Sequence, residues 1–512
     1  MSKKPAAMRF LDAVERLGDR LPDPVFIFAW LVLALVVASV ICAAMGVSAV
    51  HPGDGELLVA KSLLDGENVR RLLTEMPKTL TGFAPLGYVL LVMLGAGLAE
   101  RVGLLSAVIR ILVRGTPRAL LTPTIIVVGL FANHAADSGF IILLPLAAVA
   151  FASAGRHPIA GLVCAMASCV AAFAGNPTPS QFDALILGFT EPAVHLLDPG
   201  WRVNLLGNWW FTMAGALLFV PVGWWVTDRI VEPRLGPWTS PEGHVFADDE
   251  LGPDQRKGLR RAGLAALVVA ALWAGMALLP GAPLRDTAAS DLTQWTPFFR
   301  SLIAGFFVLF LASGWAYGSA TGAIASHRDV VRLAGESMAA MAPYIVLAFA
   351  AAHFIAMFTW SNLGVIIAIN GAQALKASGM PMVVLLLGVV VMTAVLDLFI
   401  GSASAKWAAI APVLVPMFML LGVSPEMTTA AYRMGDSTVN MSSPLMPYFA
   451  LALGFAQRWR PNIGVGGLMS SLLPYSFAFI FVALAVTGAF AAFELPTGPG
   501  APFHYDAAAL AR

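Results

Sequence analysis

The run Gly401-Ser402-Ala403-Ser404-Ala405-Lys406 lies in the middle of the apolar stretch 381–421. A second polar run, Asn133-His134-Ala135-Ala136-Asp137-Ser138-Gly139, lies in the middle of the apolar stretch 119–154. Both stretches exceed the roughly 20 residues of one membrane crossing. A polar turn at membrane depth is tolerated only where protein or a water-filled cavity covers it. We therefore expect each stretch to form a re-entrant helical hairpin that enters and leaves the membrane on one side.

The composition is that of a membrane protein. The 512 residues are 58% hydrophobic and 12% charged, with a mean hydropathy of +0.79, whereas soluble domains carry about 25% charged residues. These values exclude a disordered chain and argue against an ordinary cytosolic enzyme. A net charge of +1 gives no basic field for nucleic acid, so no nucleic-acid partner is expected. Cys42, Cys164 and Cys169 match no zinc-binding spacing and are interpreted as small buried hydrophobes.

The other apolar stretches predict nine transmembrane helices. The expected fold is an all-α polytopic membrane protein with nine transmembrane helices plus two re-entrant helical hairpins in inverted repeats. Residues 1–23 are polar, and no small-residue cleavage site ends the apolar stretch that follows, so this first helix is expected to stay in the membrane. The nine predicted crossings are 25–47, 83–99, 158–190, 204–227, 261–280, 299–320, 340–372, 428–456 and 463–492.

The distribution of basic residues predicts the orientation. With the N-terminus in the cytoplasm, the inner segments carry 20 Lys and Arg residues and the outer segments carry 9, as the positive-inside rule requires. The same topology places the first hairpin on the inner side and the second on the outer side. The outer loop 51–82 and the inner loop 229–261 are too short to hold an enzyme domain.

The two hairpin regions align when the chain is shifted by 267 residues, which indicates an internal repeat. The expected organisation has transport repeats at 119–203 and 381–462, scaffold segments at 1–118 and 204–380, and a last helix with a tail at 463–512. Because the predicted hairpins open to opposite sides, the repeats are inverted, which is typical of secondary transporters with a midplane site. The alternative is chance alignment of a chain rich in Pro and Gly. The shift pairs Pro145 with Pro412, Gly155 with Gly422, Pro158 with Pro425, and Pro177 with Pro444.

Each predicted hairpin is followed by a helix that contains its own break. The first break is Gly175-Asn176-Pro177-Thr178-Pro179-Ser180 and the second is Asn440-Met441-Ser442-Ser443-Pro444. Proline removes a donor and clashes with the preceding turn, so neither run continues a straight helix. The freed backbone groups, with oxygens such as that of Asn176, are suited to hold a cation or an anionic group. The alternative is a plain proline kink at each place.

Ionisable residues inside the predicted membrane segments are candidate functional residues because burying a charge there is costly. Arg433 suits a substrate carboxylate, and Asp436, three residues further on the same helix face, either pairs with it in a static ion pair or carries a proton. Asp183 has no evident partner in the sequence and is expected to carry a proton, the alternative being a hydrogen-bonded structural role. Lys406 either extends toward the membrane surface, pairs with Asp397 or contacts substrate. Asp137 lies at the tip of the first hairpin.

Three further groups of residues allow a functional interpretation. Trp407 follows the second tip and either stacks on an aromatic substrate ring or packs in the core. His134 and Asp137 lie three residues apart, but no third ligand accompanies them, so no resident metal is expected. The spacings of Ser402 and Ser404 to Lys406 do not match a Ser-x-x-Lys nucleophile, so the chain is predicted not to be an enzyme and to have no organic cofactor.

Three strings resemble one transporter family. Residues 398–407, residues 432–437 and the run Gly175-Asn176-Pro177-Thr178 are similar to the AbgT family, the p-aminobenzoyl-glutamate transporters. The resemblance extends over essentially the whole chain. It implies bowl-shaped homodimers in the bacterial inner membrane, each protomer with nine helices, two hairpins and its own pathway. It also implies p-aminobenzoyl-glutamate uptake or proton-driven sulfonamide export, with a sodium ion associated with the fold.

The resemblance also implies roles for Asp183, Trp407, Pro425, Arg433, Asp436 and Pro444. The other candidates come from the polar turns and the first helix break. At position 397, where the family pattern has Asn, this chain has Asp, and an extra carboxylate there would alter ion coupling or substrate charge preference. The ion-coupling candidates are Asp183, Asp436, Asp397, Asn133, Asp137 and Asn176, with transient sodium at Asn133 and Asn176. The expected substrate site comprises Asp183, Trp407, Pro425, Arg433, Asp436, Pro444, Ser402, Ser404 and Asn176.

The sequence therefore predicts a secondary active transporter for p-aminobenzoyl-glutamate or related aryl compounds. Two alternatives stay open. The first is a sodium-coupled dicarboxylate importer of the same superfamily, against which the string around Trp407 argues. The second is a channel, which gives no reason for paired broken helices.

Overall fold

The computed structural model describes residues 24–50, 55–113, 116–131, 134, 136–238, 251–279, 281–286, 292–397, 400–444, 446 and 448–506. Within these ranges the protein is almost entirely helical. Two short antiparallel strands, β1 (Ser48–Val50) and β2 (Leu57–Val59), pair with Ala49 opposite Leu58.

The first half of the chain forms these helices: α2 (Pro24–Ala44), α3 (Gly66–Thr81), α4 (Ala84–Arg101), α5 (Leu104–Val113), η1 (Arg118–Leu120), α6 (Leu121–Phe131), α7 (Ala136–Ser153), α8 (Pro158–Ala171), α9 (Gln181–Val194), α10 (Trp209–Val226), the π-helical turn η3 (Thr227–Val231), α11 (Glu232–Leu235) and α12 (Pro253–Leu278). The second half forms η4 (Leu292–Trp295), α13 (Thr296–Thr321), α14 (His327–Ala340), α15 (Ala342–Trp360), α16 (Leu363–Ala377), α17 (Met382–Leu396), α18 (Ala403–Leu420), α19 (Pro425–Val439), η5 (Asn440–Ser442), α20 (Phe449–Trp459) and α21 (Val465–Ala492).

Seven helical segments of the described chain are long and apolar enough to cross a membrane. They are Gly66–Arg101, Trp209–Leu235, Pro253–Leu278, Thr296–Thr321, Ala342–Trp360, Ala403–Leu420 and Val465–Ala492. Shorter apolar helices accompany them, among them α8, α16 and α17. The all-helical membrane architecture is thus confirmed, while nine crossings with two hairpins stays a prediction.

One predicted crossing is wrong as a continuous helix. The stretch 340–372 divides into α15 and α16, with Asn362 in the left-handed region at φ 58°. Asn tolerates this conformation because its side chain is short and polar. Here the Asn362 Nδ2 donates to the Val59 carbonyl at 3.0 Å, so strand β2 fixes the bend. Composition alone shows no break at this point because the stretch is apolar on both sides of it.

The helix bounds agree with the internal repeat at a shift of 267 residues. Helices α7 and α18 begin at Ala136 and Ala403 and end at Ser153 and Leu420, a difference of 267 at each end. Helices α8 and α19 then begin at the paired prolines Pro158 and Pro425.

The turns before these prolines also match between the repeats. Gly155 and Gly422 have φ values of +68° and +88°, a conformation that glycine adopts without steric cost. The Gly-to-Pro spacing therefore encodes the same helix–turn–helix unit twice.

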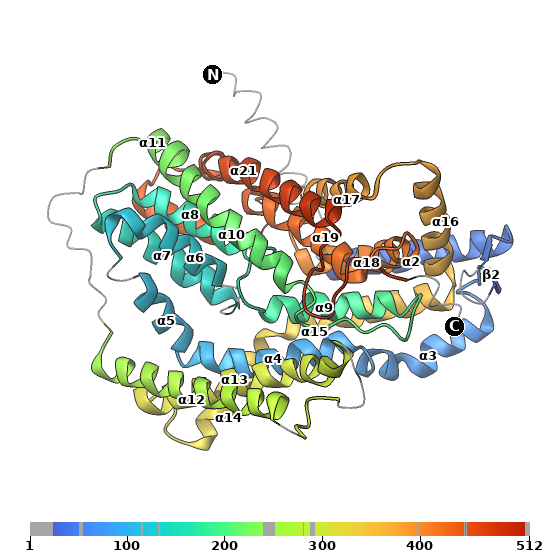
Figure 1. Cartoon of the computed structure of the whole chain (residues 1–512), viewed down its shortest axis with the longest axis horizontal. Coiled ribbons are helices and arrows are strands. Elements are labelled where there is room, and N and C mark those ends of the chain that lie inside the picture. Colours follow the sequence, from blue (N-terminus) through green and yellow to red (C-terminus); the bar gives the residue numbers. More distant parts are fainter. Residues whose placement is uncertain are drawn as a thin grey trace.

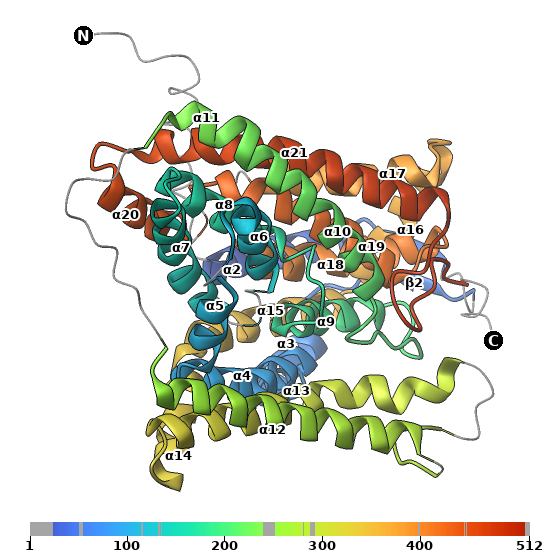
Figure 2. The same cartoon turned by 60° about the vertical axis from the view of Figure 1, so that its left-hand side comes forward.

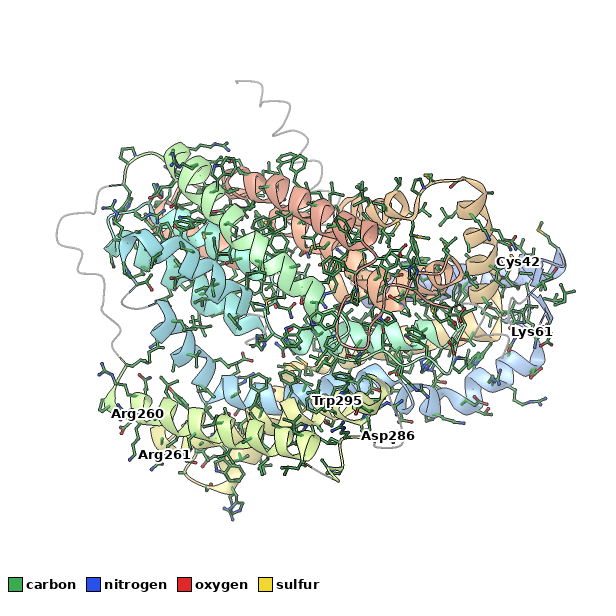
Figure 3. The ribbon with its side chains drawn as sticks, in the orientation of Figure 1. Cys42, Lys61, Arg260, Arg261, Asp286 and Trp295 are labelled. Carbon is green, nitrogen blue, oxygen red and sulfur yellow. The ribbon has the colours of Figure 1, made fainter. Side chains whose placement is uncertain are left out.

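The helices form two layers joined by the helices between them (Figures 1 and 2). Helices α4, α12, α13 and α14 form the lower layer, and α6–α8, α10, α17–α19 and α21 form the upper one. In Figure 3, Arg260 and Arg261 lie at one end of the molecule, and Cys42 and Lys61 lie at the other. These residues belong to segments predicted to face opposite sides of the membrane, so their separation agrees with the predicted topology.

An ion-pair network around the buried Arg156 ties the first repeat to η3 and α11, the helical segments that follow α10. Arg156 Nη2 lies 2.6 Å from Asp228 Oδ1 and also contacts Glu232, and its Nη1 donates to Thr122 at 2.7 Å. Burial opposes the charge of Arg156, but hydrogen bonds to the two carboxylates outweigh it, so the pKa of the guanidinium is raised.

Close packing between α17 and α19 depends on one glycine. A Cβ at Gly435 would lie 2.4 Å from the Val390 carbonyl of α17, which is backbone and has no rotamer to change. We expect Gly435→Val to destabilise the fold by about 1–3 kcal/mol or more through overpacking. Thermal unfolding in detergent measures this, with Gly454→Val as control because no atom lies within 4 Å of a Cβ there. Equal loss in both variants would contradict the packing argument.

Candidate substrate and ion-coupling site

The first break is held open by hydrogen bonds from neighbouring helices. Helix α8 ends at Ala171, a further turn runs to Gly175, whose amide donates to the Ala171 carbonyl at 2.8 Å, and α9 begins at Gln181. Residues 176–180 therefore cross the interior between the two helices. The indole of Trp209 on α10 donates to the Pro177 carbonyl at 2.8 Å. At the far end Ser180 caps α9 and Asp183 closes the capping box. The break is therefore a defined structure and not merely a kink.

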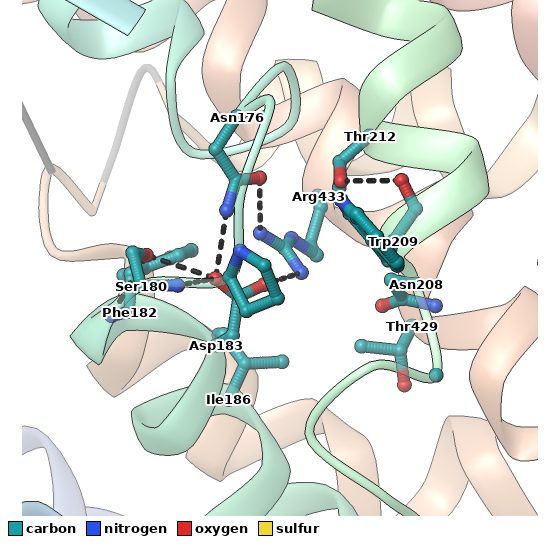
Figure 4. A network of polar contacts seen from close by, with 12 residues as sticks. Asn176, Ser180, Phe182, Asp183, Ile186, Asn208, Trp209, Thr212, Thr429 and Arg433 are labelled. Atoms are coloured by element: carbon teal, nitrogen blue, oxygen red, sulfur yellow. Dashed lines mark hydrogen bonds and ion pairs between the residues drawn. The ribbon is translucent and has the colours of Figure 1, made fainter. Parts of the chain in front are cut away.

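Asp183 on α9 and Arg433 on α19 form a buried ion pair across this break (Figure 4). Arg433 Nη1 lies 2.7 Å from Asp183 Oδ1, and the two side chains are only 1% and 7% exposed. Asp183 Oδ2 also accepts from Asn176 at 2.7 Å and from the Ser180 amide at 2.6 Å. Arg433 donates in addition to the Phe173 carbonyl and to Asn176 Oδ1. The structure thus supplies the partner for Asp183 that the sequence did not reveal.

A second buried cluster lies beneath the tip before α18. Lys406 Nζ lies 2.6 Å from Asp436 Oδ1 and also contacts Asp397. All three side chains are at most 1% exposed. Asp397 caps the C-terminus of α17 and Lys406 lies in the first turn of α18, so each charge opposes the dipole of its own helix. The carboxylates and the ammonium therefore stabilise one another.

These contacts decide between the pairings considered from the sequence. The pairing of Lys406 with Asp397 is confirmed. A static ion pair between Arg433 and Asp436 is wrong, because Arg433 pairs with Asp183 and Asp436 pairs with Lys406. With every group ionised, the Arg433–Asp183 pair is neutral and the Asp397–Lys406–Asp436 triad carries one excess negative charge.

Trp407 lies inside the protein in this conformation. It is fully buried and stacks on Tyr432, with ring centroids 4.4 Å apart. Its indole nitrogen donates to Thr190 on α9 at 2.9 Å. The residue joins three helices, α18, α19 and α9.

A cavity of about 320 Å³ lies against the second tip. Its polar lining comes from Ser402, Ser404, Asn440 and Gln181. Its apolar lining includes two stacked aromatic pairs, Phe140 with Tyr448 at 4.1 Å and Phe173 with Phe182 at 4.6 Å between ring centroids. Arg433 contacts Phe173 and Phe182 but is not among the lining residues.

A smaller cavity of about 20 Å³ lies on the other side of the ion pair. Asp183, Arg433, Glu426, Thr429 and Asn208 are among its lining residues.

Comparison with known proteins identifies the family of this chain. A sequence model of the AbgT transporter family matches residues 9–505. The chain belongs to the AbgT transporter family. It is 36% identical to the Escherichia coli (strain K12) p-aminobenzoyl-glutamate transport protein over 487 residues, 95% of each chain.

Two solved AbgT-like structures share its fold. The Alcanivorax borkumensis YdaH transporter aligns with TM-score 0.88 at 39% identity, covering 93% of this chain and 100% of that one. Neisseria gonorrhoeae MtrF, described as one of a class of antimetabolite efflux pumps, aligns with TM-score 0.89 at 39% identity, covering 96% and 100%. This AbgT protein is therefore a multi-pass membrane transporter and not an enzyme.

Four other residues predicted for the site are not among the described lining residues of the large cavity: Pro425, Pro444, Asn133 and Asp137. Pro425 is buried at the start of α19, and Pro444 is half-buried in the second break. Asn133 lies outside the described residues, and Asp137 belongs to α7 but its side chain is likewise outside the described part. Among the described residues no group of three His, Cys, Asp or Glu side chains is placed to hold a metal. His134 instead contacts the Pro179 carbonyl at 2.9 Å, linking the first tip to the first break.

Sequence reasoning missed part of the cavity lining. Asn440 belongs to the second break, so the sequence already indicated it as a candidate for the lining. The pair of Phe140 and Tyr448 could not be predicted, because the two residues come from different repeats and meet only in the fold. Glu426 was also missed, since it lies at a helix start that resembles an ordinary surface end.

Proposed function

We propose that this protein is a secondary active transporter for p-aminobenzoyl-glutamate and related aryl anions, sulfonamides included. The observation that supports it most is the cavity of about 320 Å³ with two aromatic pairs and a polar end. Cavities of this size, mostly apolar with a few polar groups, are typical small-molecule sites. Of the relatives named above, the Escherichia coli protein is named for p-aminobenzoyl-glutamate transport and MtrF is described with antimetabolite efflux pumps, which agrees with an aryl ligand.

The cavity offers complementary groups for both ends of such a substrate. An aryl ring fits against the aromatic pairs in offset stacking. The N-terminus of α18 faces the same cavity through Gly401, Ser402 and Ala403. Its free amides and positive dipole end favour a carboxylate. In the proposal, Arg433 and Trp407 reach the substrate only in the alternate conformation, because both are covered in this one.

For ion coupling we propose the Asp397–Lys406–Asp436 triad. Its excess negative charge is buried in a part of the protein predicted to lie in the membrane, where an unneutralised charge is costly. One bound proton removes that charge. Asp183, by contrast, already accepts from Arg433, Asn176 and Ser180. Asn176 uses both ends of its amide in the same network, so a sodium ion at Asn176 requires this network to open.

The predicted topology also assigns the conformation. A cavity of about 530 Å³ lined by Val25, Phe26 and Pro343 shares Tyr344 and Ser404 with the aromatic cavity. These first residues of α2 and α15 are cytoplasmic ends when the N-terminus is inside. We therefore propose that this conformation faces inward, in the bacterial inner membrane, and that the repeats 119–203 and 381–462 move against the remaining scaffold.

Asp397→Asn is expected to remove the excess charge while keeping the Lys406–Asp436 pair. The variant should fold and bind substrate, but proton-driven transport should vary less with pH because the triad no longer gains and loses a proton. Initial uptake rates measured across a pH series test this. An unchanged pH profile in a folded variant would exclude the triad as the coupling site.

The proposed function is tested by uptake into proteoliposomes. Radiolabelled p-aminobenzoyl-glutamate is supplied under an imposed proton or sodium gradient, with sulfamethazine or succinate as competitor. The proposal expects saturable, gradient-driven uptake that sulfamethazine inhibits. Inhibition by succinate alone would indicate the dicarboxylate importer, and uptake that never exceeds equilibration would indicate a channel.

A further inference from the structure

Glu426 is a buried carboxyl group that has no part in the proposed triad or aromatic cavity. It is the second residue of α19 and is only 2% exposed. Among the described residues its Oε2 has no hydrogen-bond partner, and its carboxyl group receives a long contact of 3.4 Å from the Trp201 indole at Oε1 and a contact from its own backbone amide. An ionised carboxylate so poorly hydrogen-bonded is costly to bury, whereas a protonated one is not.

No cation compensates Glu426 within the described part of the chain. The elements packed around it contribute other charged or titratable groups, which form contacts of their own. Asp183 pairs with Arg433, and Asp198 accepts from Tyr505. Asp436 pairs with Lys406, His195 contacts Arg202, and Glu494 pairs with His504. Asp506 also has an interaction of its own. None of the ion pairs described includes Glu426.

A polar path leads from Glu426 to the buried ion pair. Glu426, Thr429 and Arg433 lie at positions i, i+3 and i+7, on one face of α19. Together with Asp183 they line the small cavity of about 20 Å³, and a water molecule needs roughly 10–15 Å³ by this measure. In Figure 4, Thr429 and Asn208 lie beside Arg433 on this side of the pair. Glu426 and Arg433 are separated by two helical turns, about 10 Å along α19. A chain of the Thr429 hydroxyl and one or two water molecules suits this distance.

Glu426 is covered by two segments predicted to face outward. Gly207 packs directly on it, since a Cβ there would lie 2.9 Å from the Glu426 Cγ. The C-terminal segment 493–506 lies over this region. Thr497 Oγ1 donates to the Gly207 carbonyl at 2.7 Å, and the Ser424 amide donates to the Phe503 carbonyl at 2.9 Å.

We propose that Glu426 is a proton-binding residue on the outer side of the transport pathway. When the cover of residues 198–208 and 493–506 opens, Glu426 exchanges its proton with the outer solution. While the cover is open and outer water solvates the Glu426 carboxylate, the proton passes through the water-sized cavity to Asp183, a proton site additional to the triad. The O–H bond at Glu426 breaks and one forms at Asp183, so Glu426 becomes a carboxylate and Asp183 becomes neutral.

This inference rests on the proposed proton-driven transport, and the experiment separates the two. Wild-type, E426Q and E67Q proteins are reconstituted, and each is assayed for substrate exchange without a gradient and for uptake driven by a proton gradient. Glu67 is the matched control because it is an exposed glutamate in the predicted outer loop 51–82, outside the cover. E426Q should keep exchange and lose driven uptake, whereas E67Q should keep both. Wild-type protein without driven uptake would refute the proposed function itself.

The overturning result is E426Q with the driven uptake and outer-pH dependence of the wild type. If E426Q fails to fold, a second measurement tests the proposal on the wild-type protein. Infrared spectroscopy of the wild type should show the carbonyl band of a protonated buried carboxyl, and E426D should shift that band. A wild-type spectrum with no such band at neutral pH would equally overturn the assignment.

Discussion

Arg433→Ala is expected to abolish transport and to destabilise the protein by about 3–5 kcal/mol, the cost of leaving one partner of a buried ion pair alone. Arg433 neutralises Asp183 and also donates to Asn176 and to the Phe173 carbonyl. Its loss therefore removes these contacts between α19 and the first break. Uptake in proteoliposomes and thermal unfolding in detergent measure the two effects.

A double variant separates charge from function. Arg433→Ala combined with Asp183→Asn removes the isolated carboxylate, so stability should largely return while transport stays absent. Arg332→Ala is the matched control, because Arg332 is 55% exposed and pairs with Glu336 on the surface. Such exposed pairs contribute about 1 kcal/mol or less. Wild-type stability in Arg433→Ala would show that the pair does not hold the break.

Lys406→Met is the second change with a large expected effect. It leaves Asp397 and Asp436 buried together without their shared cation, and two like charges in such a site repel each other. Transport should be lost and stability should fall by about 3–5 kcal/mol. Unfolding measured at several pH values should show that lowering the pH recovers part of the loss, because protons then neutralise the two carboxyls.

Combining Lys406→Met with Asp397→Asn tests the cause. This double variant keeps one buried carboxylate in place of two and should be more stable than Lys406→Met alone. If both variants unfold at the same temperature, the repulsion between Asp397 and Asp436 is not the source of the instability.

The sequence predicted features that depend on local patterns. Proline and glycine act on their own backbone, so the pairs Gly155–Gly422 and Pro158–Pro425 are enough to reveal the repeat and the starts of α8 and α19. Likewise the polar middle of 381–421 marked the tip before α18, because an apolar chain has no local reason to break there.

The partners of the buried charges required the fold. Asp183 and Arg433 are 250 residues apart in the sequence, and their contact depends on how α9 and α19 meet across the break. Spacing on one helix left a pair of Arg433 with Asp436 as one alternative, since residues three apart share a face. In the structure Lys406 competes for Asp436, and a lysine at the start of α18 has more to gain from a carboxylate than an arginine already held by Asn176 and Asp183.

Trp407 also depends on the fold. Its position after the tip left two alternatives, stacking on a substrate ring or packing in the core, and the family resemblance supplied the substrate role. In this conformation Trp407 stacks on Tyr432 and donates to Thr190. Packing between helices from different repeats decides such a position, and no local signal reports it.

Proton coupling through the buried triad requires protons to move together with the substrate. Wild-type proteoliposomes containing a pH-sensitive dye receive p-aminobenzoyl-glutamate outside, with no sodium present. Substrate entry should change the internal pH, and this change should disappear in Lys406→Met vesicles containing verified folded protein. Substrate accumulation that follows only a sodium gradient, with no change of internal pH, would contradict proton coupling through the buried triad.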